Sequence, residues 1–422
     1  MCTRETGSLS SEMGVNNPST VDDTTELTQE LYTKEEVNEK LLSGKVVFLK
    51  GVKRSCLVGE GMLIKVNTSV GVGSRNPAGY KKEINKIDYL SSVGYRPDIM
   101  MDLSIVTLGS PLYKYIINTV GIPVGTLPHY LCFDSKNGID DSLFLNEIEK
   151  QAKAGVAFMT FHPTPTKSLV EKSIELRRTP FTSRGGGLVI FDMYNKPRKE
   201  NIISDLFPEI LDILKGNKVA LSIGSTFRPA NIFDALDTVH KEEFERQGIF
   251  IEMAKKAGIP VIFEGVGHMT LNKIAEYAEM IRRYEIPFMP LGPIPTETSV
   301  GMDHISSVIG STSMAQLGAA HIFNTITREE HTGGIPSRES IDEALRSARI
   351  AGHIVDLSRF PKISSADKLI SDQRTENTSC IVVGVGLENG PKAIGCSRCG
   401  YECPLRIMGK VANQIKSEND RK

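Results

Sequence analysis

The sequence has almost no net charge and no long apolar run. Among its 422 residues, 50 Lys and Arg side chains are balanced by 51 Asp and Glu side chains. No overall field therefore attracts nucleic acid or an anionic membrane, and any anionic ligand must be held locally. No stretch approaches the roughly 18 apolar residues of a membrane span. We expect no nucleic-acid partner and no membrane partner.

The N-terminus lacks the basic start and apolar core of a signal peptide. Residues 1–30 are polar, and we interpret them as an N-terminal lead of a cytoplasmic protein. Cysteine is also scarce, and four of the seven cysteines are scattered, at Cys2, Cys56, Cys132 and Cys380. In a reducing cytosol this scatter indicates free thiols and no disulfide framework.

Only the last three cysteines have the spacing of metal ligands. Cys396, Cys399 and Cys403 lie in GCSRCGYECP with the pattern C-x2-C-x3-C. A structural zinc site takes four ligands, and no Cys or His follows Cys403. An iron–sulfur cluster held by three thiolates leaves one iron open, which can chelate S-adenosylmethionine and reduce its sulfonium. A zinc knuckle or a plain group of thiols is the alternative.

Short apolar runs alternate with longer helix-like segments over most of the chain. We count eight such runs, at 98–104, 121–128, 156–162, 187–192, 219–224, 260–265, 287–292 and 319–323. This alternation fits an open doubly wound sheet as well as a (β/α)8 barrel. Because polar groups such as PHY, FHP, FRP and EGVGH follow run after run, the barrel is favoured: its strand ends converge on one active site.

The flanks of the barrel suggest additional parts. We predict an α/β fold with a (β/α)8 TIM-type barrel over residues 97–360. Residues 31–96 form a small N-terminal α/β layer, and residues 361–422 form a C-terminal helical tail that carries the cysteines.

Two histidines follow the sixth and eighth runs. His268 lies in EGVGHMT and His331 in REEHTGG, at neighbouring parts of the predicted barrel rim. As a pair near Glu264 they can bind one divalent metal ion and leave positions open for substrate. Two separate hydrogen-bonded structural histidines are the alternative.

A glycine run and an arginine form a candidate anion site. In SRGGG, the backbone N–H groups after Ser183 can point at one anion while Arg184 supplies several donors and Gly185 lets the backbone approach. Arg228, in STFRP, is a second cation at the next strand end. A phosphate-bearing substrate fits both, whereas a Gly-rich turn with surface arginines is the alternative.

Taken in order, these motifs resemble the ThiC family of radical S-adenosylmethionine enzymes, represented by the hydroxymethylpyrimidine phosphate synthase of thiamine biosynthesis. The resemblance covers most of the chain through MDLS, PVGTLPHY, FHP, SRGG, STFRP, FEGVGH, PFMPLGPI, GMDHI, REEHTGGIP and CSRCGYEC. It implies a barrel, a divalent metal, expected to be zinc, on His268 and His331, and a [4Fe-4S] cluster on Cys396, Cys399 and Cys403. It implies substrate contacts at Met101, Tyr130, His162, Ser183, Arg184, Gly185, Arg228 and Glu264.

The sequence departs from the family pattern at five further candidate substrate positions. Ser69 replaces an asparagine, Ser225, Thr226 and Phe227 stand where the thiamine enzyme has Asp, Gly and Leu, and Met289 replaces a tyrosine. A carboxylate and a phenol are therefore missing from the pocket, which changes its acid–base chemistry. The cysteine spacing is also one residue shorter than in long thiamine enzymes.

This pattern resembles the branch of the family that makes 5-hydroxybenzimidazole for the lower ligand of cobamides. The resemblance implies a carbon–carbon lyase that converts 5-aminoimidazole ribotide with S-adenosylmethionine and a flavodoxin- or ferredoxin-type reductant. Glu264 and His162 are then the expected catalytic groups. We also expect a homodimer, with a homologous partner subunit as a further possibility. The alternatives are a hydroxymethylpyrimidine phosphate synthase and a non-catalytic, partner-dependent ribotide-binding subunit.

Overall fold

Eight parallel strands form the centre of the larger part of the chain. The computed structural model describes residues 32–421, except 74–75, 108, 377–379 and 381–397. The chain divides after Arg359 into two units, and the strands belong to the first. In sequence order the strands are β3 (Lys65–Val70), β4 (Ile99–Asp102), β5 (Val124–Thr126), β8 (Phe158–Phe161), β9 (Ala220–Ile223), β10 (Val261–His268), β11 (Phe288–Ile294) and β12 (Ile322–Asn324).

The strands close into a barrel. They are arranged in the order β11-β10-β9-β8-β5-β4-β3-β12, and every neighbouring pair is parallel. The two end strands meet, because the N–H of His321 donates to the carbonyl of Phe288 at 2.9 Å and Asn324 Nδ2 donates to the carbonyl of Pro290 at 2.8 Å. The predicted TIM-type barrel is confirmed.

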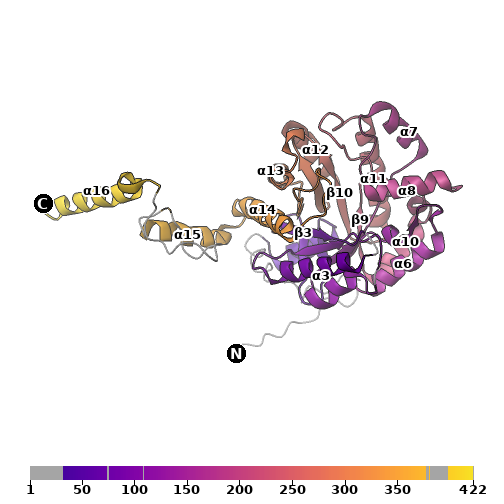
Figure 1. Cartoon of the computed structure of the whole chain (residues 1–422), viewed down its shortest axis with the longest axis horizontal. Helices are drawn as coiled ribbons and strands as arrows, with labels where there is room; N and C mark the ends of the chain where they lie inside the picture. The colour runs from indigo at the N-terminus through magenta and orange to yellow at the C-terminus, as the bar shows by residue number, and fades with distance from the viewer. Residues whose placement is uncertain (1–31, 74–75, 108, 377–379, 381–397, 422) are drawn as a thin grey trace. The chain divides into compact units, whose positions relative to one another are not determined.

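Amphipathic helices surround the strands (Figure 1). Several begin at a polar cap that fixes where the helix starts: Asp140, Thr166 and Asp237 accept the N–H three residues on. The longer helices are α3 (Pro77–Ser92), α6 (Asp141–Lys153), α7 (Lys167–Leu176), α8 (Arg184–Asn195), α10 (Phe207–Asn217), α11 (Thr238–Lys256), α12 (Leu271–Arg282), α13 (Asp303–Gln316) and α14 (Arg338–Leu357). Short helices α4 (Leu112–Tyr115), α5 (His129–Cys132) and α9 (Ile202–Asp205) lie between them. None of the helices in the described ranges is long and apolar enough to cross a membrane.

An N-terminal hairpin covers one end of the barrel. After α2 (Lys34–Leu42), the antiparallel strands β1 (Val46–Leu49) and β2 (Cys56–Gly59) place Val47, Leu49 and Val58 in one apolar cluster with Ile99 and Phe158. Ile99 and Phe158 are the first residues of their strands. The hairpin therefore covers the N-terminal ends of the strands, and the C-terminal ends remain for a ligand.

Two assignments from the sequence are corrected. The run 187–192, expected as a strand, lies in helix α8, and β3 is a barrel strand instead of part of an N-terminal layer. Periodicity cannot separate a short buried strand from a buried helix segment, which explains the first error. Strand β3 (KVNTSV) reads as polar, because Asn67 and Ser69 share the inward face with Ile99 and Met101 of β4. The barrel therefore begins before the expected boundary at residue 97.

The second unit, from Phe360 onward, is helical in its described residues. It contains the 3-10 turns η4 (Pro361–Ser364) and η5 (Gly400–Glu402) and the helices α15 (Ser365–Glu376) and α16 (Pro404–Asn419). Cys399 and Cys403 stand directly before and after η5.

Candidate active site

Five of the expected ligand-binding side chains meet at the C-terminal ends of the strands. Tyr130 lies on α5 after β5, His162 directly after β8, Arg184 at the start of α8, Arg228 after β9 and Glu264 on β10. The Arg184 guanidinium lies 5.7 Å from the centre of the Tyr130 ring. Burial has the largest effect on all three of the other side chains, because it raises the pKa of Tyr130 and Glu264 and lowers the pKa of His162. The positive charge of Arg228 is near enough to act on each of them in the lowering direction. The rim thus combines two cations, one carboxyl, one imidazole and one phenol.

Glu264 is a buried carboxyl group held by two hydroxyls. Its side chain is 3% exposed, and Oε1 accepts hydrogen bonds from Thr160 Oγ1 at 2.7 Å and Ser222 Oγ at 2.6 Å. Thr160 and Ser222 are paired across β8 and β9, so the sheet register brings both to Glu264. Burial raises the pKa of Glu264 above its ordinary value, against the opposing effect of the hydroxyls and Arg228. This environment favours a carboxyl group that can hold a proton.

His162 is a neutral imidazole packed between glycines. A Cβ on Gly185 would lie 2.7 Å from Nδ1 of His162, and a Cβ on Gly224 would lie 2.7 Å from Nε2. Burial, then the neighbouring His129, then Arg228 lower the pKa of His162 well below its ordinary value. The imidazole can accept a proton only weakly, so it is better suited to hydrogen bonding than to general-base catalysis.

His129 is a second buried imidazole that the sequence did not single out. Its ring centre lies 5.7 Å from that of His162, in an edge-to-face arrangement. Neither ring nitrogen makes a hydrogen bond of ordinary geometry within the described residues, although the backbone of Gly185 lies close to the ring. Burial lowers the pKa of His129 to about 3, against a smaller opposing effect of the Gly185 backbone. The PHY sequence was the available signal, but only its tyrosine was interpreted.

The SRG motif stands at the start of α8. Ser183 caps the helix by accepting the N–H of Gly186 at 3.1 Å, which leaves the N–H groups of Arg184 and Gly185 in the first turn. Helix N-termini with such N–H groups favour anions. Ser183 and Gly185 are buried, whereas Arg184 is exposed. The SRG motif therefore stands at a helix N-terminus, and binding of an anion there stays a prediction.

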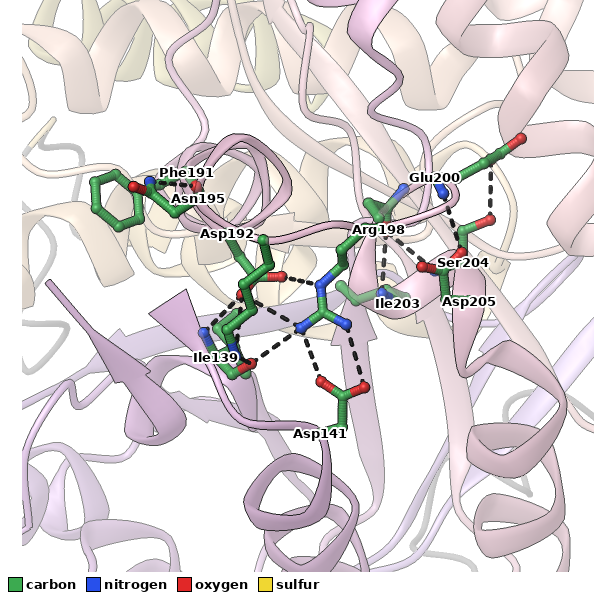
Figure 2. A network of polar contacts seen from close by, with 12 residues as sticks. Ile139, Asp141, Phe191, Asp192, Asn195, Arg198, Glu200, Ile203, Ser204 and Asp205 are labelled. Carbon is green, nitrogen blue, oxygen red and sulfur yellow. Dashed lines mark hydrogen bonds and ion pairs between the residues drawn. The ribbon is translucent and has the colours of Figure 1, made fainter. Parts of the chain in front are cut away.

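A polar network fixes the other end of α8 (Figure 2). Asp192 is fully buried, and its Oδ1 accepts the N–H of Ile139 at 2.8 Å. Arg198 forms an ion pair with Asp192 and donates to Asp141 Oδ1 at 2.8 Å, as Figure 2 shows. These contacts tie α8 to the hairpin of β6 (Phe133–Asp134) and β7 (Gly138–Ile139). Breaking them would leave the buried charge of Asp192 without its partner, which is costly in free energy.

The substituted loop after β9 uses most of its groups internally. Ser225 Oγ donates to Glu243 Oε2 at 2.6 Å, and the Phe227 ring packs in an apolar cluster with Leu169 and Val239. The Thr226 methyl and hydroxyl pack against Gly186. Phe227 also donates its N–H to Glu243 and accepts from Arg177 at its carbonyl. Phe227, expected as a substrate contact, therefore supports the loop instead.

The methionines lie on the inner face of the barrel. Met289 is paired with Glu264 across β11 and β10, and Met101 is paired with Ser69 across β4 and β3. Met101 and Met289 both belong to the inner apolar cluster and are 5% and 0% exposed. Ser69 and Met289, two of the departures from the family pattern, thus share the inner face with Glu264.

His268 and His331 face one another at the rim. Their Nε2 atoms are 3.1 Å apart. Each Nδ1 contacts a carboxylate: Glu297 Oε1 at 3.0 Å from His268 and Asp303 Oδ1 at 2.8 Å from His331. A carboxylate at Nδ1 fixes the proton there, so both Nε2 atoms present lone pairs.

Two facing lone pairs at this distance require a cation between them or a proton shared by them. Two imidazole nitrogens on one tetrahedral zinc, each at ~2.0–2.1 Å, lie about 3.3 Å apart. The observed separation of 3.1 Å fits such a shared ion. No group of three His, Cys, Asp or Glu ligands is found in the described part of the chain. A metal here would therefore keep positions for water or substrate.

Glu297 and Asp303 were missed by the sequence analysis. Asp303 stands in the quoted motif GMDHI and begins α13, whereas Glu297 lies in the 3-10 turn η3 (Glu297–Ser299). Neither has ligand spacing relative to the histidines, since each contacts its histidine across about 30 residues of chain. Only the fold brings the carboxylates to the imidazoles.

The expected cluster ligands are only partly within the described residues. Cys396 lies outside them. Cys399 is exposed and Cys403 is buried, one on each side of the turn η5. Thiolates are the usual ligands of iron–sulfur clusters, so the donor set fits the expected group.

Comparisons with known proteins identify the family of the chain. Residues 19–410 match the radical SAM ThiC family. The phosphomethylpyrimidine synthase of Carboxydothermus hydrogenoformans is 31% identical, with 90% of this chain and 94% of that protein covered. The protein of the same name from Pyrobaculum aerophilum is 30% identical, with 90% and 93% covered.

The solved structures with a similar fold are more distant. Dihydropteroate synthase of Xanthomonas albilineans, with 4-aminobenzoic acid, has 13% identity and a TM-score of 0.42, with 73% of this chain and 98% of that chain covered. The family is shown by the sequence match over most of the chain and by the two similar proteins of about 30% identity. This chain belongs to the radical SAM ThiC family.

Proposed function

We propose that this protein is a radical S-adenosylmethionine enzyme that rearranges 5-aminoimidazole ribotide. The observation that carries the proposal is the convergence of Arg184 and Arg228 with Glu264 at one end of the barrel. A ribotide carries a phosphate that two cations and a helix N-terminus can bind. Its heterocycle carries nitrogen atoms that a buried carboxyl group can hydrogen-bond or protonate.

The chain's own residues then have distinct tasks. Arg184, Ser183 and Gly185 bind the phosphate at the start of α8, and Arg228 binds the phosphate or ribose. Tyr130 and His162 orient the ligand, because Tyr130 lies near the charges of both arginines and His162 near the charge of Arg228. Glu264 moves or holds a proton at its Oε2, since both hydroxyl donors contact Oε1.

Cys396, Cys399 and Cys403 would hold a [4Fe-4S] cluster. When bound, that cluster supplies the electron, taken from a flavodoxin or ferredoxin, that cleaves S-adenosylmethionine. His268 and His331 would hold one divalent ion, which we propose is zinc. Its remaining coordination positions would accept a polar group of the substrate or of S-adenosylmethionine.

For the product, the comparisons support 4-amino-5-hydroxymethyl-2-methylpyrimidine phosphate. The relatives that cover about nine-tenths of this chain carry the name phosphomethylpyrimidine synthase. The SRG residues, Arg228 and the three cysteines of the resemblance all remain in this sequence, although the cysteine spacing is one residue shorter.

A second candidate product, 5-hydroxybenzimidazole, is favoured by one specific observation. The positions at which the thiamine enzyme has an aspartate and a tyrosine are Ser225 and Met289 here. Ser225 donates to Glu243, and Met289 lies beside Glu264 on the inner face. The pocket therefore offers less acid–base chemistry for the same substrate, and a different fate of the ribose carbons fits that change.

The assembly we propose is a homodimer. Exposed apolar side chains on α13 and α14 support it: Ile305, Ile309, Ile350 and Ile354 are each about half exposed. Sedimentation of the purified chain gives the mass directly, and a monomeric mass would contradict this assembly.

One anaerobic assay tests the function and separates the products. The chain is reconstituted with iron and sulfide and incubated with ribotide, S-adenosylmethionine and a reductant, and products are identified by mass. We expect the unmodified chain to form 5′-deoxyadenosine together with one of the two products. We expect the Arg228→Gln variant to form neither of the two products. Ribotide that remains unchanged would overturn the proposal, unless a homologous chain restores turnover, which would show a partner-dependent subunit.

A further inference from the structure

Glu243 lies under the loop that carries Arg228 and accepts four hydrogen bonds. It is fully buried on the inner side of α11. Its Oε1 accepts from Thr164 Oγ1 at 2.7 Å and from the N–H of Thr226 at 2.6 Å. Its Oε2 accepts from Ser225 Oγ at 2.6 Å and from the N–H of Phe227 at 2.8 Å. Both oxygens are thus fully used by groups that follow β8 and β9.

The chemistry of these donors requires a carboxylate. Two of them are backbone N–H groups, which can only donate, and a carboxylate is the side chain that accepts at both ends. A glutamine has the same shape, but its NH2 group would replace one of the two oxygens. That NH2 group would then face two hydrogen-bond donors and could accept from neither. The four hydrogen bonds therefore depend on the two acceptor oxygens of the Glu243 carboxylate as well as on the length of its side chain.

The loop held by Glu243 directs Arg228. Nη1 of Arg228 donates to the carbonyl of Ser225 at 2.9 Å, inside the segment that Glu243 binds. On the same face of α11, one turn later, Gln247 Nε2 donates to the carbonyls of Gly224 at 3.1 Å and Glu264 at 3.0 Å. Helix α11 thus holds both the loop after β9 and the backbone of β10 at Glu264.

We propose that Glu243 is a positioning residue that aims Arg228 at the ligand, and that the Ser225 hydroxyl serves this carboxylate instead of the substrate. The inference rests on the proposed function, because the ligand of Arg228 is taken to be the ribotide. The residue at position 225 then affects ligand specificity indirectly, through its contact with Glu243. An aspartate at 225 that kept the serine's orientation would place two carboxylates together, and such pairs share one proton.

The test measures binding of 5-aminoimidazole ribotide to the full-length chain by calorimetry, without turnover. Five single variants are compared with the unmodified protein: Glu243→Gln, Ser225→Ala, Ser225→Thr, Arg228→Gln and the exposed control Glu245→Gln on the same helix. We expect Glu243→Gln and Ser225→Ala to weaken ribotide binding about tenfold, since each loses hydrogen bonds to a charged group. Ser225→Thr keeps its hydroxyl and, with the control, stays within about threefold.

A double variant distinguishes positioning from general loss of structure. If Glu243 acts through Arg228, then Ser225→Ala or Glu243→Gln adds less than about twofold in the Arg228→Gln background, because coupled residues are not additive. The same tenfold loss in both backgrounds would overturn the inference. If Glu243→Gln fails to fold, Ser225→Ala, which removes one donor, decides the question alone.

The two levels of the account fail in different ways. Failure of the unmodified chain to bind ribotide would overturn the proposed function, and this inference with it. Tight binding by the unmodified chain that persists in Ser225→Ala would overturn only the inference.

Discussion

The N–H of His268 donates a 2.9 Å hydrogen bond to the carbonyl oxygen of Pro229. Pro229 directly follows Arg228, so one proposed metal ligand is tied to the loop of the anion-binding arginine. The contact depends on a bulge at the end of β10, where Val266 and Gly267 have φ angles of 92° and 87°. A valine in this region is strained, and such strain collects at functional sites.

Gly267→Ala should uncouple this contact. Its Cβ would overlap the carbonyl oxygen of Pro229, and an L-residue at positive φ is itself strained. We expect a loss of about 1–3 kcal/mol in the free energy of unfolding and weaker binding of both zinc and ribotide. Gly258→Ala is the matched control, because Gly258 has φ 75° but nothing within 4 Å of its Cβ position. Equal effects of the two variants on ligand binding would refute the coupling.

Asp303→Asn should weaken the metal site without removing a ligand. The amide can present its NH2 to Nδ1 of His331 and so favour the wrong imidazole tautomer. We expect a 10–100-fold loss in zinc affinity, measured by competition with a chelator. His268→Ala should abolish stoichiometric binding, and Glu245→Gln should change nothing. Zinc held equally well by Asp303→Asn would show that the carboxylate does not orient the histidine.

His129 should make stability depend on pH. Burial lowers its folded pKa to about 3, whereas an unfolded histidine has a pKa of about 6.5. The unfolded state therefore binds more protons below pH ~6.5, and the stability present above that pH is lost as pH falls. Replacement by leucine should reduce the slope of unfolding free energy between pH 6 and 5 by at most ~1.4 kcal/mol per pH unit.

Urea unfolding at several pH values measures this slope. The raised pKa values of Glu243 and Glu264 act in the opposite direction at lower pH, but they are common to both proteins and cancel in the comparison. Identical slopes for the two proteins would mean that His129 is not buried as a neutral imidazole.

Glu264→Gln should reduce turnover and leave the fold intact. The amide oxygen can still accept from Thr160 and Ser222, but the group no longer transfers a proton. We expect a loss of about 10²–10⁴-fold in turnover with the thermal midpoint nearly unchanged. Thr160→Val serves as a comparison, since it removes one donor and keeps the carboxyl group. Full activity of Glu264→Gln would exclude proton transfer by this residue.

The alternation of apolar runs and helices was enough to predict the barrel, but not every strand in it. The count of eight was right because two errors cancelled: 187–192 is helical, and β3 was left outside. Strand β3 shows the physical reason. Asn67 faces the barrel interior and donates to Asn324 at 2.7 Å, so a buried strand carries polar residues that hide its apolar pattern.

The site was predictable where its residues stand at strand ends. The groups PHY, FHP, FRP and EGVGH were noted because each follows or ends an apolar run, and the fold brings such ends together. The family resemblance then pointed to Tyr130, His162, Arg228 and Glu264 within them. Glu243, Glu297 and Asp303 were not identified, since they act from helices and a turn on partners distant in sequence. No spacing in the sequence marks such a partner, and only the packed structure shows it.

The central claim is that this chain rearranges the ribotide by radical chemistry, and one measurement tests it most directly. The reconstituted protein is given S-adenosylmethionine, reductant and ribotide uniformly labelled with 13C in the ribose, and the products are analysed by mass and NMR. The account predicts 5′-deoxyadenosine together with a new heterocycle that has ribose-derived 13C in its ring. If S-adenosylmethionine stays intact while the ribotide is unchanged, or if the new heterocycle carries no label, the account is contradicted.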